Sequence, residues 1–339
     1  MAIEGDPGAR VPEWDAVRGF AVAGVVIAQT WRVTGVPATV SPGVLDPVRH
    51  LLAVVAEGCF LPILAFLFGV GFSVLAERAA ARGERPWLVL GRRVLALGVL
   101  GLLHQVFQPG EALLPYALAG AVILLPATGL PRWCALAGGL VATAGAVLAL
   151  GDGFGLLPGL FLLGLAAARY GVLERFRERG WLVALVFALA LPAAVLAAQW
   201  EFRTPYLDLA SSAPAVAGLL AGLAYATGLL LVLRTGFGAI VGDVLRPLGR
   251  MALTNYLGAT ALILLADARL HLSASNSYVA LLLLACVVVL AQAVVSTGWS
   301  RWFVHGPVEW LWRCVTWWEW VPLRRRGPEP AAPLGLHLP

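Results

Sequence analysis

The sequence predicts an all-α, polytopic integral membrane protein with about ten transmembrane helices and a C-terminal interfacial helix. Of its 339 residues, 60% are hydrophobic and only 13% are charged, and the mean hydropathy is +0.84. A soluble domain carries roughly 25% charged residues, so this composition favours a chain that crosses a bilayer several times. The apolar runs are continuous rather than alternating, which indicates helices and not the strands of a membrane barrel.

Ten apolar runs are candidates for bilayer-crossing helices, each of which needs about 20 mostly apolar residues. They are separated by charge clusters and by Gly and Pro turns, and the fourth and sixth are short. The runs lie at 17–36, 50–76, 87–107, 112–129, 131–150, 155–170, 181–200, 213–233, 249–270 and 277–299. We therefore expect residues 1–300 to form one transmembrane helical bundle.

The positions of the basic residues, all of which are arginine, test this count. With a cytoplasmic N-terminus, all but four of the 24 fall on the cytoplasmic side, and the exceptions are Arg32, Arg49, Arg203 and Arg269. This asymmetry follows the positive-inside rule, so we expect both termini in the cytoplasm. The net charge of +5 then reflects topology and not nucleic-acid binding. An acidic leader without an A-x-A site favours an uncleaved first span.

Residues 301–339 are expected to form a cytoplasmic interfacial helix and a disordered tail. The stretch RWFVHGPVEWLWRCVTWWEW, from Arg301, is too polar to cross the bilayer and is rich in tryptophan, which suits the headgroup level. Pro307 is well placed to begin a helix, in which Glu309 and Arg313 form an i,i+4 pair.

Metal and nucleotide chemistry find no support in the sequence. The four cysteines are far apart and fit no zinc or disulfide spacing, so we expect no metal site. There is no Walker GxxxxGK[ST], no GxGxxG after a strand, no HExxH and no GxSxG motif. Their absence from the sequence disfavours ATP-driven transport and classical hydrolase chemistry.

Polar residues inside apolar runs are the candidates for function, because the bilayer makes them costly. In the first span, Arg18 and Gln29 are eleven residues apart, about three helical turns, and lie on nearly one face. Snorkelling by Arg18 and an interhelical hydrogen bond from Gln29 are the structural alternative.

Titratable side chains gather at the predicted outer ends of the first three spans. They are Arg32, His50, Glu57, His104 and Glu111. His50 and Glu57 are expected two turns apart on one helix face, and Glu111 follows His104 after a short Pro-Gly turn. A histidine and two carboxylates near one membrane face are suited to general acid–base work, whereas hydrogen-bonded interfacial histidines are the alternative.

A second polar cluster lies at the predicted inner side, in LRPLGRMALTNYLGA at 245–259. Arg246 and Arg250 precede a span whose first turns carry Asn255 and Tyr256. Two arginines at the inner mouth of a polar-lined helix suit the binding of phosphates. Positive-inside anchoring explains the same arginines equally well.

Several of these segments resemble the YeiB-like membrane proteins, also known as domain of unknown function 418. WDAVRGFAVAGVVIAQ is similar to the family's opening LDALRGFALLGILLVN. Later signatures are resembled by FLPILAFLFGVGFSVLAERAAARG, by RRVLALGVLGLLHQVF with GEALLPYALAG, by GRMALTNYLGAT and by HGPVEWLWRCVTW. Glu111 and Tyr116 occupy the acidic and tyrosine positions of the third signature. The resemblance covers most of the chain and is weakest over 130–230.

In its first span this family is similar to transmembrane acyltransferases, including acyltransferase family three and the heparan glucosaminide acetyltransferases. The resemblance implies transfer of an acyl group from cytoplasmic acyl-CoA to an extracytoplasmic glycan, lipid or small-molecule acceptor. Arg18 matches the arginine of family three, and Gln29 falls on its catalytic histidine, which is asparagine in the heparan enzymes. Glutamine binds substrate by hydrogen bonds but does not act as a base.

The site that we expect combines this resemblance with the polar clusters. His104 is the preferred base with Glu111 as its partner, His50 is second, Glu57 is a further carboxylate, and Gln29 positions substrate. The expected contacts to donor and substrate are Arg18, Arg32, Tyr116, Arg250, Asn255 and Tyr256.

The expected location is the bacterial cytoplasmic membrane. The expected partners are the lipid bilayer, acyl-CoA and the acceptor, without nucleic acid, and a homodimer is left open. A transporter or permease for a small metabolite or lipid is the alternative function, since it would use the same polar groups in a cavity between helices. A membrane scaffold with a tryptophan-rich tail is the third.

Overall fold

The structure is a computed structural model that describes residues 12–36, 39–41, 44–149, 153–204, 211–275 and 277–324. These residues are mostly helical, which confirms the predicted fold class. The predicted acidic leader and the end of the predicted tail, at 1–11 and 325–339, lie outside the described residues.

The elements follow the sequence in simple order. They are α1 (Pro12–Thr34), β1 (Thr39–Ser41), β2 (Val44–Leu45), α2 (Pro47–Val55), α3 (Phe60–Ala81), α4 (Pro86–Gln105), α5 (Leu113–Ala119), the π-helix η1 (Gly120–Leu124), α6 (Leu125–Ala127), α7 (Arg132–Ala149), the 3₁₀-helix η2 (Gly153–Leu156), α8 (Leu157–Arg169), α9 (Val172–Glu178), α10 (Gly180–Arg203), α11 (Ala213–Val232), α12 (Gly238–Arg250), α13 (Ala252–Leu270), α14 (Leu272–Ser275), α15 (Tyr278–Trp302) and α16 (Pro307–Trp317). The two short strands pair antiparallel.

Six of the described helical segments are long and apolar enough to cross a bilayer, or eight if each of two bent helix pairs is one span. The pairs are Phe154–Arg169 with α9, bent by 63°, and α12 with α13, bent by 83°. The two remaining predicted spans coincide with α1 and with the shorter apolar segment Leu113–Ala127. The chain is thus a multi-pass membrane protein by helix length and composition, whereas the predicted number of ten spans is not confirmed.

Two of the predicted spans are interrupted. Residues 50–76 are divided between α2 and α3 by a turn in which Gly58 has a φ of +75°, a conformation that favours glycine. The span predicted at 249–270 is α13, preceded by an additional helix, α12, that begins at Gly238. The backbone changes direction between these two helices at Met251.

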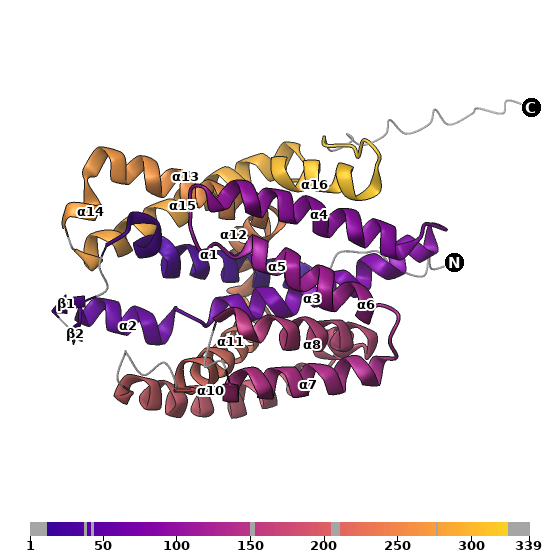
Figure 1. Cartoon of the computed structure of the whole chain (residues 1–339), viewed down its shortest axis with the longest axis horizontal. Coiled ribbons are helices and arrows are strands. Elements are labelled where there is room, and N and C mark those ends of the chain that lie inside the picture. The colour runs from indigo at the N-terminus through magenta and orange to yellow at the C-terminus, as the bar shows by residue number, and fades with distance from the viewer. Residues whose placement is uncertain are drawn as a thin grey trace, which may run out of the picture.

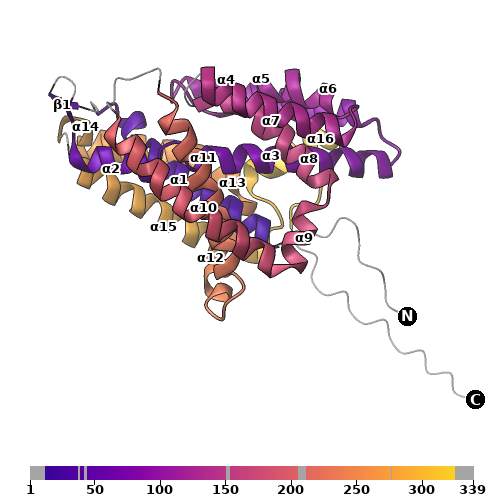
Figure 2. The same ribbon diagram turned by 90° about the horizontal axis from the view of Figure 1, so that it is seen from below.

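Helix α1 lies at the centre of the bundle and contacts α3, α12, α13 and α15. On one side of it lie α7, α8, α10 and α11, and on the other lie α4, α13, α15 and α16 (Figure 1). One end of α12 projects from the rest of the bundle (Figure 2). The central position of α1 places Arg18 and Gln29 in the interior of the bundle rather than on its periphery.

Glycines allow α1 and α12 to pack backbone to backbone. A Cβ atom on Gly249 would lie 1.7 Å from the carbonyl oxygen of Asp15, and one on Gly19 would lie 2.1 Å from that of Leu245. Small residues at helix contacts of this kind are characteristic of membrane proteins. The close approach brings Arg250, at the end of α12, next to the first turns of α1.

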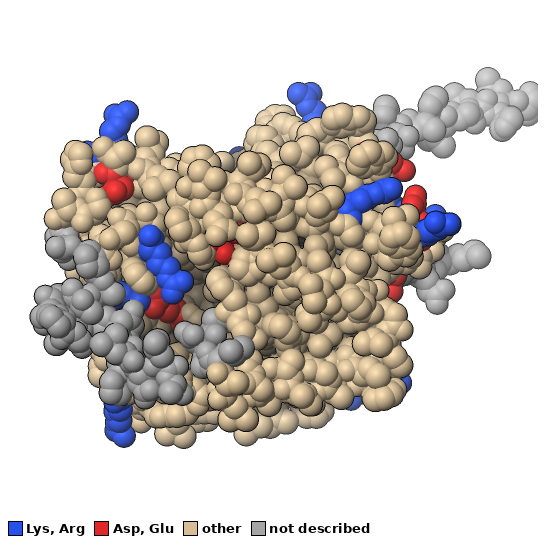
Figure 3. Space-filling model, in the orientation of Figure 1, with Lys and Arg blue, Asp and Glu red and all other residues tan. Residues whose placement is uncertain are grey.

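The surface is divided between charged ends and an apolar area. Most charged side chains visible in Figure 3 gather toward the two ends of the long axis, and the broad area between them is uncharged. Large apolar side chains are exposed on the outer helices, for example Val141 and Leu148 on α7. This distribution suits helices that face lipid chains.

Candidate functional site

A cavity of about 400 Å³ lies between α1, α3, α4, α16 and the junction of α12 with α13. We call it the arginine cavity, because Arg18, Arg78, Arg93, Arg250 and Arg313 line it. The acidic residues in its lining are Asp15 and Glu309, so the cavity is positively charged. Its volume is that of a small-molecule site, for which 300–1,000 Å³ is typical.

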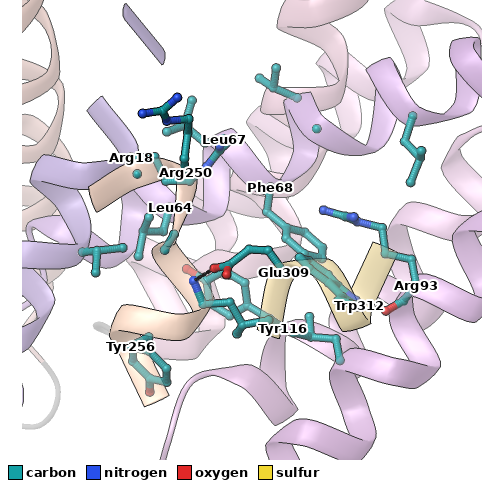
Figure 4. A pocket seen from close by; sticks show the side chains of 18 of the residues that line it. Arg18, Leu64, Leu67, Phe68, Arg93, Tyr116, Arg250, Tyr256, Glu309 and Trp312 are labelled. Atoms are coloured by element: carbon teal, nitrogen blue, oxygen red, sulfur yellow. Dashed lines mark hydrogen bonds between the residues drawn. The ribbon is translucent and has the colours of Figure 1, made fainter. Parts of the chain in front are cut away.

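Arg18 and Arg250 lie on one side of this cavity and Arg93 lies on the other (Figure 4). Arg18 Nη1 lies 3.1 Å from Asp15 Oδ1. On the opposite side, the Arg93 guanidinium lies 3.7 Å from the ring centroid of Trp312, whose indole N–H donates to the Arg93 carbonyl at 2.9 Å. These contacts hold the cations in place at the cavity wall.

Glu309 ties α16 to the first turn of α13. Its Oε1 accepts the backbone N–H groups of Leu253 at 2.6 Å and Thr254 at 2.9 Å, and the Thr254 hydroxyl donates to Oε2. Burial raises the pKa of the Glu309 carboxyl, and these hydrogen bonds oppose that shift. Helix α16 begins at Pro307, as predicted, and forms one wall of the arginine cavity.

A second, smaller cavity of about 70 Å³ has Gln29, Arg32, Glu57, Gln108 and Phe154 in its lining. We call it the Gln29 cavity. Leu61, Ala112 and Tyr256 line both this cavity and the arginine cavity. The two cavities therefore share a wall, and that wall includes Tyr256.

Tyr256 belongs to this shared wall, and Tyr116 lines the arginine cavity. The Tyr256 hydroxyl accepts the backbone N–H of Ala112 at 3.1 Å, and the Tyr116 hydroxyl donates to the Leu61 carbonyl at 2.9 Å. Both tyrosines were predicted as substrate contacts, and the structure places both in the cavity lining.

His104 and Glu111 lie together, as their spacing around the Pro-Gly turn predicted. His104 Nδ1 is 3.5 Å from Glu111 Oε2. The carboxylate also accepts the backbone N–H groups of Leu113 and Leu114, each at 2.6 Å, and so caps the start of α5. Within the described part of the chain, neither residue belongs to the lining of the two cavities; the His104 ring packs against Tyr256 instead.

Glu57 lies in an ion-pair cluster beside the Gln29 cavity. Its carboxylate accepts the indole N–H of Trp31 at 2.7 Å and an N–H of Arg49 at 2.6 Å, and Arg32 Nη2 is 3.8 Å away. Arg49 is 1% exposed. The cluster joins the end of α1 to the turn after α2.

His50 lies apart from this cluster. Its ring stacks on Phe202 with centroids 4.2 Å apart. The predicted common helix face for His50 and Glu57 is wrong, because α2 ends at Val55 and Glu57 belongs to the turn that follows.

Asn255, predicted as a donor contact, is directed toward α15. Its side-chain amide donates to Ser296 Oγ at 3.0 Å and to the Leu248 carbonyl at 3.2 Å. Its backbone carbonyl accepts a hydrogen bond from the Gln292 side chain at 2.6 Å. These bonds join the junction of α12 and α13 to α15. Asn255 is not among the residues that line the arginine cavity.

Two residues of the polar interior were not predicted from the sequence. Thr260 Oγ1 lies 3.0 Å from His104 Nε2 and donates to Gln108 Oε1 at 2.7 Å, and Gln108 Nε2 donates to Gln29 Oε1 at 3.1 Å. All of these side chains are buried. The only sequence signal for Gln108 is its position four residues after His104, the last residue of the GLLH segment.

Metal-binding geometry is not found in the described residues. Among them, no group of three or more His, Cys, Asp or Glu side chains is arranged to hold an ion. The cysteines are free thiols.

These features define a multi-pass helical membrane protein in which a positively charged cavity and a small polar cavity share a wall. The chain belongs to the DUF418 family: a family model described as "Protein of unknown function (DUF418)" matches residues 167–319, and the full-length relatives support the assignment.

Three relatives are similar over most of their length. The "Uncharacterized 39.9 kDa protein in amylase 3'region" of Bacillus acidopullulyticus is 31% identical over 91% of this chain and 94% of its own length. YeiB of Escherichia coli K12 is 28% identical over 93% of this chain and 96% of its own length. YxaH of Bacillus subtilis is 26% identical over 79% and 81%, respectively. No solved structure matches the chain.

Proposed function

We propose that this protein is an acyltransferase of the bacterial cytoplasmic membrane, with both termini in the cytoplasm. It transfers an acyl group from cytoplasmic acyl-CoA to an extracytoplasmic glycan, lipid or small molecule. The observation that carries the proposal is the wall shared by an arginine-lined cavity and a polar cavity at Leu61, Ala112 and Tyr256. Two substrates that approach from opposite sides of a bilayer require such a meeting point.

In this proposal the arginine cavity binds the donor. Guanidinium groups pair with phosphate oxygens at two points each, which suits the phosphates of CoA. Arg18 and Arg250 provide this contact, and the apolar interior beyond them receives the thioester arm. Tyr116 and Tyr256 line the path of that arm toward the Gln29 cavity.

The reaction replaces the carbon–sulfur bond of the thioester with a bond from the acceptor to the acyl carbon, and it moves one proton from the acceptor to the CoA sulfur. The acceptor oxygen or nitrogen attacks the acyl carbon, the carbon–sulfur bond breaks, and the acceptor proton leaves on the CoA thiol. Glu57 is the carboxylate in the lining of the Gln29 cavity and carries this proton. His104 and Glu111 are not among the residues that line either cavity, so we assign them to positioning rather than to proton abstraction.

The test is acetyl-CoA binding to the purified full chain, measured by thermal shift. Wild type should be stabilised progressively, by about 2.7 kcal/mol when the ligand is at a hundred times its Kd. Arg250→Ala should reduce this response, whereas Arg175→Ala, which changes an exposed arginine of α9, should not. No response of wild type at millimolar acetyl-CoA would remove the donor from the proposal.

A transporter for a small metabolite or lipid is the second candidate, and one observation favours it. Helices α12 and α13 form a pair bent by 83°, and Arg250 at the junction lines the arginine cavity. Transporters commonly bind substrate at such discontinuous helices. Uptake by proteoliposomes without formation of an acylated product would favour transport, and an acylated product with free CoA would favour the enzyme.

A further inference from the structure

A continuous chain of hydrogen bonds joins the start of α5 to the Gln29 cavity. It runs from Glu111 to His104, Thr260, Gln108 and Gln29, across α4, α13 and α1. Each of these side chains is at most 7% exposed. Unpaired polar groups are costly in such an environment, so each proton in the chain must face an acceptor.

The single proton of a hydroxyl group sets the direction of this chain. Thr260 Oγ1 donates its proton to Gln108 Oε1 at 2.7 Å. The contact of 3.0 Å between Thr260 Oγ1 and His104 Nε2 must therefore use a proton on the ring nitrogen. On the other side of Thr260, the Gln108 oxygen is occupied, so its amide nitrogen is the group that donates to Gln29 Oε1.

The hydrogen-bond chain begins at Glu111, which is fixed by backbone N–H groups. Glu111 accepts two N–H groups at the start of α5, which hold it as an acceptor. Its Oε2 lies 3.5 Å from Nδ1 of His104, so the fixed carboxylate orients the His104 ring toward Thr260.

The hydrogen-bond chain ends at Gln29, whose side-chain amide nitrogen has no partner within the described structure. Gln29 Nε2 is buried and has no hydrogen-bond partner within the described structure, although Gln29 lines the Gln29 cavity. The amide oxygen is used by Gln108, so the group offered to the cavity is an N–H donor. An acceptor oxygen that enters the Gln29 cavity is the group that this N–H is able to bind.

We propose that Gln108 and Thr260 are positioning residues, which fix the Gln29 amide so that its N–H donates to the carbonyl oxygen of the acyl group. This inference rests on the proposed function and assigns the acyl-recognition step to the Gln29 cavity. An N–H aimed at the carbonyl stabilises the negative charge that develops on its oxygen during acyl transfer. The volume of about 70 Å³ is sufficient for a group of a few heavy atoms, since a site needs only ~10–15 Å³ on this measure to hold one water.

The test compares acetyl-CoA with CoA as ligands for the purified full chain. Thr260→Val removes the hydroxyl at nearly constant volume, and Thr260→Ser retains it. We expect Thr260→Val to weaken acetyl-CoA binding about tenfold, equivalent to 1.4 kcal/mol, and to leave CoA binding unchanged. Thr260→Ser should bind both ligands as wild type does.

The infrared carbonyl band of [1-¹³C]acetyl-CoA provides a second readout. Bound to wild type and to Thr260→Ser it should shift to lower wavenumber, and in Thr260→Val that shift should be lost. Equal weakening of acetyl-CoA and CoA by Thr260→Val would mean a structural role and overturn the inference. An unshifted band in wild type that binds both ligands would overturn it while leaving the donor site intact. Failure of wild type to bind either ligand would overturn the proposed function as well.

Discussion

The close contact of α1 with α12 predicts that Gly249→Ala will damage both stability and the donor site. The added methyl group would lie 1.7 Å from the Asp15 carbonyl oxygen, and real Cβ contacts are essentially never below 3.0 Å. The helices must therefore separate by about 1.3 Å at this point. The obstacle is backbone, so the cost should reach the upper end of overpacking penalties, ~3 kcal/mol, of which the better helix propensity of alanine offsets ~1 kcal/mol.

The expected net loss is thus about 2 kcal/mol, measured as a lower midpoint of thermal unfolding in detergent. Because Arg250 follows the substituted residue, acetyl-CoA should also stabilise the variant less than wild type. Gly91→Ala is the matched control: nothing lies within 4 Å of its Cβ position in α4, and it should be stabilised by ~1 kcal/mol. Equal midpoints for the two variants would refute the packing argument.

Three further changes test separate contacts. Glu309→Gln should gain stability relative to wild type as pH rises above about 4.5, the ordinary pKa of a glutamate. Burial raises the pKa of Glu309 in the folded state, so wild type loses stability between pH 4.5 and that raised pKa. A flat difference in unfolding midpoint between pH 4 and 8 would contradict this. Glu111→Gln should lower the free energy of unfolding by ~2 kcal/mol, as a charged acceptor of two backbone N–H groups is lost, and an unchanged midpoint would show that the cap is unimportant. Tyr256→Phe should cost ~1–3 kcal/mol by leaving the Ala112 N–H without its acceptor, and denaturant unfolding without such a loss would mean that water replaces the hydroxyl.

The positions of most helices could be predicted because an apolar run of sufficient length has few other structures available in a bilayer. The interruptions could not. Gly58 lies in the turn that divides α2 from α3, and Met251 marks the bend of 83° between α12 and α13. The polar residues before them, Glu57 and Arg250, are equally compatible with the ordinary end of a span. The path of the helix axis within an apolar run is determined by packing against other helices, and it cannot be read from the periodicity of the sequence.

The candidate site was predictable where its partners are close in sequence. His104 and Glu111 are seven residues apart around a turn, so their contact could be expected. Thr260 and Gln108 are 152 residues apart, and nothing local indicates that they meet. Asn255 was placed in the donor site because it follows Arg250, but the bend at the start of α13 directs it toward α15 instead.

Helix α16 has a consequence for how the protein is made. It is the last helix of the described chain to leave the ribosome, and it supplies Glu309, Trp312 and Arg313 to the arginine cavity. A nascent chain with every apolar span already inserted still lacks this wall. Translation that stops before Pro307 would therefore give a product that inserts into the membrane normally but has an incomplete binding site, so the site is completed only once α16 has been made.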